Sequence, residues 1–137
     1  MRLGFDLDGT VADLHSALAQ EARRLFPDID PAALPNSAAP DQTAAPESQA
    51  QDDRTAASQA AGVSIGALSS RQQNEMWNAV CARENFWETL DEIEPGSLAR
   101  LYQLVRTHRW ELIFLTSRPE THGDTAQAQS HRWLAAT

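Results

Sequence analysis

The sequence predicts an α/β protein, specifically a partial Rossmann-like parallel sheet with a helical cap insert. Two short apolar runs, residues 2–8 and 110–115, have the length of buried strands, and each ends in polar residues. Segments with apolar residues at helical spacing follow each run. In open parallel sheets, ligands bind where the carboxyl ends of the strands meet. We therefore expect a single site, formed where these two strands end.

The first predicted strand is followed by a helix over residues 14–26, for which Asp13 is the expected N-cap. Pro27 and Pro31 are expected to end it, because proline cannot continue a helix. The apolar stripe of this helix consists of Leu14, Ala17, Leu18, Ala22 and Leu25.

The composition changes sharply over residues 35–62, which are rich in Ala, Pro, Ser, Gln and Asp. This stretch contains no aromatic residue and no Leu, Ile, Val or Met. Such a segment cannot bury enough apolar surface to offset its conformational entropy. We therefore predict a low-complexity, disordered stretch within the cap insert.

Order is expected to return with a helix over residues 69–84. The aromatic segment 86–90 is expected to pack against this helix, and Trp77, Phe86 and Trp87 are expected to belong to the cap core. Cys81 shares a helix face with Trp77, which favours a buried, inert thiol over a nucleophile.

A third helix is predicted over residues 97–107, after the turn signal Pro95-Gly96. The strand 110–115 is expected to be covered on both faces, because its apolar run is continuous. A last helix is predicted over residues 125–135, with Asp124 as a possible cap. The inward-facing residues of the third helix are predicted to be Leu98, Leu101, Leu104 and Val105. On this basis residues 1–13 and 93–137 form the core, and residues 14–92 form the cap insert.

Length and charge exclude several classes of function. A chain of 137 residues fits one domain with an insert, and its net charge of −8 argues against binding to nucleic acid polymers or anionic membranes. No apolar stretch approaches the ~20 residues that span a bilayer, and no secretory leader is expected. The single cysteine allows no internal disulfide, so a reducing cytoplasm is the expected compartment.

Asp6 and Asp8 are the first candidate functional residues. Side chains two positions apart on a strand point the same way, so two carboxylates would face one small volume. Like charges at that separation favour a cation between them, and Mg²⁺ is the hard cation for oxygen ligands. Gly9 allows a turn and close approach of a ligand, and Thr10 adds a hydroxyl. The alternative is an ordinary turn, because Asp-Gly is a common turn pair.

The full string Phe5-Asp6-Leu7-Asp8-Gly9-Thr10-Val11 resembles the first motif, DxDGT[VL], of the haloacid dehalogenase-like (HAD) superfamily. Thr116, at the end of an apolar run, resembles the second motif of that superfamily. The stretch 85–90, followed by Pro95-Gly96, is similar to capped members, including deoxyribonucleotidase-like ones. The resemblance covers residues 1–13 and 86–137.

This resemblance implies a role for each motif residue. Asp6 would be the nucleophile that forms an aspartyl-phosphate, and Asp8 would be the general acid and base. Mg²⁺ would be held by the Asp6 carboxylate, the Asp8 main-chain carbonyl and the phosphate, which Thr116 would also bind. Gly9 and Thr10 belong to the same phosphate-binding set. The resemblance thus implies a Mg²⁺-dependent phosphatase that acts on a small phosphomonoester, such as a nucleotide or sugar phosphate.

Arg118 lies two residues beyond Thr116, where its guanidinium could bind a phosphate or a substrate carboxylate. The alternative is a solvated arginine after a strand. Ser117 and His122 are weaker candidates, and the other histidines fit surface or helix-packing positions.

The sequence departs from the family after Thr116. The family pattern continues with a Lys or Arg and then an acidic pair, but this chain has no lysine, and no acidic residue follows Asp124. We therefore expect a truncated product, a fragment, or one part of a sheet completed by a partner chain. Two alternatives to a phosphatase follow, namely a non-catalytic module that binds phosphate or Mg²⁺ weakly, and a two-part enzyme.

Overall fold

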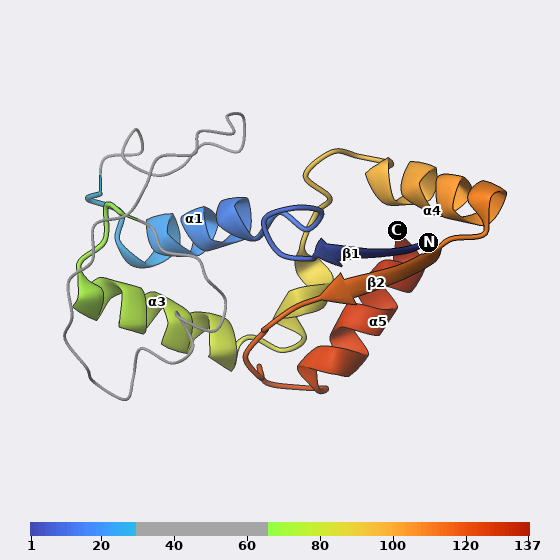
Figure 1. The fold of residues 1–137 in the computed structure, drawn as a ribbon. Helices are drawn as coiled ribbons and strands as arrows, with labels where there is room; N and C mark the ends of the chain where they lie inside the picture. Colours follow the sequence, from blue (N-terminus) through green and yellow to red (C-terminus); the bar gives the residue numbers. More distant parts are fainter. Residues whose placement is uncertain (30–65) are drawn as a thin grey trace.

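The computed structural model of the chain describes residues 1–29 and 66–137. These residues form a mixed α/β structure with a two-stranded parallel sheet and four α-helices (Figure 1). This confirms the α/β class, whereas the predicted low-complexity stretch 35–62 lies outside the described residues. In chain order the elements are β1 (Arg2–Asp6), α1 (Leu14–Leu25), α3 (Ser70–Ala82), the 3₁₀-helix η2 (Phe86–Thr89), α4 (Ser97–His108), β2 (Glu111–Leu115) and α5 (Ala126–Ala136).

The register of the sheet brings the two predicted motifs to one edge. β1 pairs with β2 in parallel, from Arg2 opposite Glu111 to Asp6 opposite Leu115. The ladder continues for one residue past β1, because the Leu7 amide donates to the Leu115 carbonyl at 2.9 Å. The segments that follow β1 and β2 therefore leave the sheet side by side.

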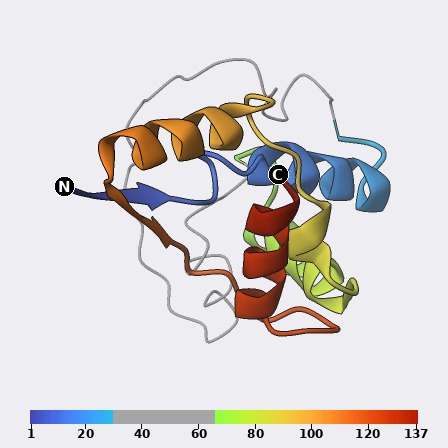
Figure 2. The ribbon, with the colours of Figure 1, turned by 90° about the vertical axis from the view of Figure 1, so that its right-hand side faces the viewer.

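The prediction that the second strand is covered on both faces is wrong. The three central residues of β2 are only half-buried, and Leu115 is 61% exposed. Figure 2 shows α4 above the strands and α5 beside them. Within the described residues the sheet has two strands, so each strand has only one neighbour and its side chains are incompletely covered.

Helices α1 and α3 pack against each other and carry much of the core. The predicted N-cap is confirmed, because the Asp13 carboxylate accepts a hydrogen bond from the Ser16 amide at 3.0 Å. A capping box of Ser69 and Gln72 starts α3. The predicted stripe of α1 is buried at Leu14, Leu18 and Ala22 and partly buried at Ala17 and Leu25.

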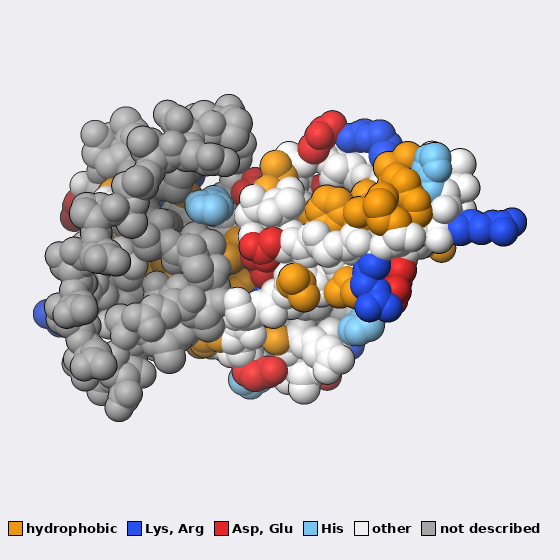
Figure 3. Space-filling view, in the orientation of Figure 1, with side chains coloured by type: hydrophobic (Ala, Val, Ile, Leu, Met, Phe, Trp, Pro, Cys, Tyr) orange, Lys and Arg blue, Asp and Glu red, His pale blue; other side chains and the backbone are white. Residues whose placement is uncertain are grey.

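Two details of the later helices differ from the prediction. Leu104 on α4 is 45% exposed instead of facing inward, whereas Leu98 and Val105 are buried as expected. The described sheet has two strands, and Figure 3 shows hydrophobic side chains at the surface over α4. The N-cap of α5 is Thr125, whose hydroxyl accepts from the Ala128 amide at 3.2 Å, and not Asp124.

The aromatic segment after α3 forms η2, which packs against α5 and not, as predicted, mainly against the preceding helix. Phe86 and Trp87 are nonetheless fully buried, so the prediction that they belong to a core is confirmed. Cys81 is only half-buried, which corrects the prediction of a buried thiol, and this partial burial raises its pKa. No helix among the described residues is long and apolar enough to cross a membrane.

Candidate functional site

A short, firmly bonded turn carries the first motif away from the sheet. The Val11 and Ala12 amides both donate to the Leu7 carbonyl, at 3.1 and 2.9 Å, and the Gly9 amide donates to the Ala12 carbonyl at 2.9 Å. Gly9 has a φ of 80°, which a glycine adopts without strain. The turn thus has a fixed shape and holds Asp8 beyond the end of β1.

Asp6 and Asp8 occupy different environments, although they are only two residues apart. Asp6 is exposed at the end of β1, whereas the side chain of Asp8 is 7% exposed. A carboxylate that is removed from water needs hydrogen-bond donors or an opposite charge. The structure supplies both to Asp8, from the segment that follows β2.

Thr116 and Arg118 together bind the Asp8 carboxylate. The Thr116 hydroxyl lies 2.7 Å from Asp8 Oδ2 and donates to it. Arg118 donates from Nε to both carboxylate oxygens at 3.0 Å and from Nη2 to Oδ1 at 2.7 Å. Such charge-assisted bonds from a planar guanidinium fix both the position and the plane of a carboxylate. The segments that follow the two strands therefore meet through Asp8, where the sequence analysis expected a single site.

Arg118 is not the solvated arginine that the sequence left open, because its side chain is only 1% exposed. Its Nη1 donates to the Ser130 hydroxyl of α5 at 2.9 Å. The guanidinium carbon lies 4.9 Å from the centroid of the Trp87 ring and 5.9 Å from that of Trp133. Two aromatic rings and three oxygen atoms, from Asp8 and Ser130, thus surround this cation, and the anion that it binds is Asp8.

Trp87 of η2, which the sequence assigned only to the core, and residues of α5 that the sequence did not single out hold this arrangement in place. Trp87 donates from Nε1 to the Pro119 carbonyl at 2.9 Å, and its amide donates to the side chain of Gln129 at 3.0 Å. Trp133 donates from Nε1 to the Leu90 carbonyl at 2.6 Å. The spacing of Ser130 and Trp133, three residues apart on one helix face, was the available signal.

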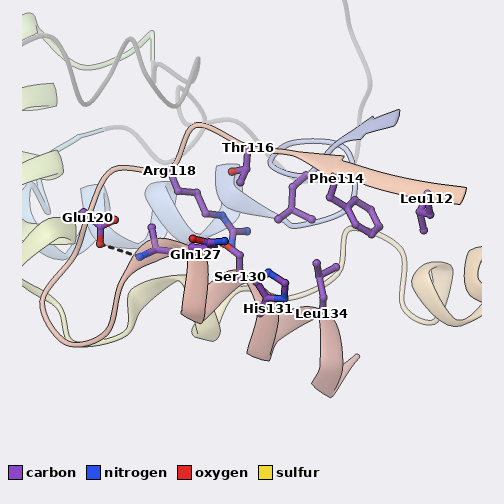
Figure 4. A pocket seen from close by; sticks show the side chains of 11 residues that line it. Leu112, Phe114, Thr116, Arg118, Glu120, Gln127, Ser130, His131 and Leu134 are labelled. Atoms are coloured by element: carbon purple, nitrogen blue, oxygen red, sulfur yellow. Dashed lines mark hydrogen bonds between the residues drawn. The ribbon is translucent and has the colours of Figure 1, made fainter. Parts of the chain in front are cut away.

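A cavity of about 560 Å³ lies between β2 and α5 (Figure 4). Thr116, Arg118 and Glu120 line its polar end, and the side chains of Leu112 and Leu134 lie toward the other end. The two donors that bind Asp8 therefore also border a space large enough for a small molecule.

Gly9 and Thr10 lie in the turn, whereas His122 lies in the segment after β2, beside the end of α3. Gly9 and Thr10 are exposed in the turn, directly after Asp8. A Cβ atom on Gly9 would lie 3.5 Å from Cε1 of His15, so this histidine covers the turn from the first turn of α1. His122 is exposed, and its main chain bonds to the Cys81 carbonyl and the Asn85 amide.

The donors present are compatible with the predicted magnesium ion, which prefers a few oxygen ligands together with water. Asp6 offers an exposed carboxylate, and the resemblance assigns the second protein ligand to the main-chain carbonyl of Asp8 and not to its carboxylate. The engagement of the Asp8 carboxylate by Arg118 therefore does not conflict with this ligand set. Within residues 1–29 and 66–137, no three His, Cys, Asp or Glu side chains form a metal-binding group.

Comparison with protein-family models gives no match for this chain, and comparison with curated proteins gives none either. The resemblance to HAD-like proteins therefore stays a prediction that rests on the motif residues.

Proposed function

We propose that this chain is a Mg²⁺-dependent phosphomonoester hydrolase of the HAD-like superfamily. One observation carries the proposal. Asp6 and Asp8, in the string that resembles the first motif, lie at the same edge of a parallel strand pair as Thr116, which hydrogen-bonds to Asp8 at 2.7 Å. The substrate class is a small phosphorylated metabolite, such as a nucleotide or sugar phosphate, and the predicted compartment is the cytoplasm.

The proposed reaction has two steps, each of which uses a carboxylate at the end of β1. An oxygen of Asp6, which is exposed, attacks phosphorus while the bond from phosphorus to the leaving oxygen breaks. Asp8, once it has left Arg118 and taken up a proton from solvent, gives that proton to the leaving oxygen, and as a carboxylate it then takes a proton from the water that hydrolyses the aspartyl-phosphate. Bound Mg²⁺ supplies positive charge that lets an anionic nucleophile approach an anionic phosphate.

The other site residues position the phosphate. The Thr116 hydroxyl and the Arg118 guanidinium are donors for phosphoryl oxygens, and both border the cavity. Gly9 and Thr10 lie in the exposed turn, where Gly9 has no side chain of its own to keep a ligand from the main chain. Binding energy of this kind serves phosphoryl transfer well, because that reaction needs mainly positioning and charge neutralisation.

A non-catalytic module that binds phosphate or Mg²⁺ is the second candidate. The observation that favours it is the close pairing of Asp8 with Thr116 and Arg118, which occupies both carboxylate oxygens. A group held in this way has to leave its partners before it exchanges a proton with a substrate. A module without turnover has no such requirement.

Phosphate release from a panel of phosphomonoesters separates the two candidates. We expect Mg²⁺-dependent turnover in the unaltered chain and a loss on the order of 10⁴-fold in Asp6→Asn, which removes the nucleophile but keeps its shape. Glu94→Gln is the matched control, because it removes an exposed carboxylate elsewhere in the fold. Equal turnover in Asp6→Asn and the control would refute the assignment of Asp6, and binding of phosphate without turnover would favour the module.

A further inference from the structure

Thr116 and Arg118, which would bind a phosphate group, already bind a carboxylate of the protein itself. The Thr116 hydroxyl and the Nε and Nη2 groups of Arg118 all donate to the carboxylate of Asp8. A carboxylate and a phosphate group present the same kind of acceptor, namely negatively charged oxygens that match the fork of a guanidinium. Asp8 thus occupies the donors that a phosphate would need.

The burial of Arg118 makes an anion at this position obligatory. The Arg118 side chain is 1% exposed, and Trp87 and Trp133 flank its guanidinium. A desolvated cation without a partner is strongly unfavourable, so the Arg118 guanidinium requires a negatively charged partner, whichever group supplies it. The bond from Nη1 to Ser130 leaves Nε and Nη2 as the edge that faces this anion.

An external anion has a path to the same donors. Thr116 is an exposed residue, and both Thr116 and Arg118 border the cavity between β2 and α5 (Figure 4). The turn that carries Asp8 is also exposed at Gly9 and Thr10, the two residues that follow Asp8.

We propose that Thr116 and Arg118 form an anion site whose resting occupant is the Asp8 carboxylate, and that an incoming phosphate group displaces it. The identity of the anion rests on the proposed function. Displacement makes Asp8 available for proton transfer only when phosphate is bound, so the contact is self-inhibitory in the resting protein. The apparent affinity for phosphate is reduced, because it depends on the fraction of molecules in which Asp8 has left the site.

The test is a titration with inorganic phosphate at constant ionic strength, followed by calorimetry and by the fluorescence of the tryptophans beside Arg118. Asp8→Asn keeps the shape of the side chain but removes the competing charge. We expect this variant to bind phosphate at least about tenfold more tightly than the unaltered chain. The control Glu94→Gln, which breaks an exposed ion pair with Arg100, should bind as the unaltered chain does. The double variant Asp8→Asn/Arg118→Gln should lose the gain.

Phosphate affinity in Asp8→Asn that is equal to or weaker than that of the unaltered chain would overturn the proposal. If Asp8→Asn is unfolded in buffer, circular dichroism decides instead. Recovery of the helical signal with phosphate, but not with sodium chloride of equal ionic strength, supports the site, and no recovery overturns it. Turnover is measured separately, so that tight binding without hydrolysis refutes only the enzyme. Hydrolysis by the unaltered chain, together with no tighter binding of phosphate by Asp8→Asn, refutes only the displacement.

Discussion

Asp8 and Glu21 both have buried carboxylates, and these are neutralised in different ways. Asp8 pairs with Arg118, and the side chains of both are nearly inaccessible, at 7% and 1% exposure. The Glu21 side chain on α1 is 2% exposed, but its partners Arg24 and Arg83 are 63% and 49% exposed. One pair is thus desolvated on both sides, and the other only on the side of the acid.

The difference between the two pairs matches their places in the fold, since one joins two helices and the other lies at the candidate site. Glu21 accepts from Arg24 one turn along α1 and from Arg83 at the end of α3, so it joins two packed helices. Its arginines keep much of their hydration and can return to water at little cost. Arg118 cannot return to water in this way, because its side chain is 1% exposed and its partners come from the turn after β1 and from α5. Its charge is tied to the candidate site.

The largest effect on stability is expected for Arg118→Met, which leaves Asp8 buried without its cation. We expect the free energy of unfolding to fall by about 3–5 kcal/mol, as measured by urea denaturation with circular dichroism. The double variant Asp8→Leu/Arg118→Met should recover most of this loss, because it removes both charges. A double variant as unstable as the single one would show that contacts with Trp87 and Trp133, and not charge pairing, are the main contribution of Arg118.

An intermediate effect is expected for Glu21→Gln in the same experiment. The amide retains a carbonyl that accepts from one arginine, and both arginines reach solvent, so we expect a loss of about 1–3 kcal/mol. Glu111→Gln, which affects only the exposed pair with Arg2, is the matched control and should change stability least. A loss for Glu21→Gln as large as that for Arg118→Met would remove the contrast between the two pairs.

A smaller effect than that of Glu21→Gln is expected for Glu92, a carboxylate that is hydrogen-bonded to main-chain amides. Hydrogen bonds from the Leu98 amide and the Gly96 amide lower its pKa from the ordinary value of 4.5. A lowered pKa stabilises the folded state above pH 4.5, and this contribution is lost as the pH falls below that value through the lowered pKa.

We therefore expect Glu92→Gln to be slightly less stable than the unaltered chain near pH 7, by up to about 1 kcal/mol. The gap should close as the pH falls below 4.5 in urea titrations at a series of pH values. A gap that stays constant with pH would show that the ionisation of Glu92 contributes nothing to the stability difference.

Local signals predicted most of the described elements. The stripe of α1 and its Asp13 cap follow from residues within four positions of each other, and both are confirmed. Predictions failed where a neighbour outside the segment decided the outcome. Leu104 on α4 is left exposed by the packing of its neighbours, and Asp124 binds Arg132 at 2.7 Å while Thr125 caps α5.

The sequence by itself determined that Asp6, Asp8 and Thr116 belong to one edge, because apolar strands that pair in parallel end on the same side. Only the tertiary structure decided what each of them contacts. Arg118 binds a carboxylate 110 positions away in the chain and lies between rings from η2 and α5. No local pattern encodes such a contact, since burial and charge pairing depend on how distant elements pack. That packing gave two aspartates of the same motif opposite environments, one exposed and one enclosed.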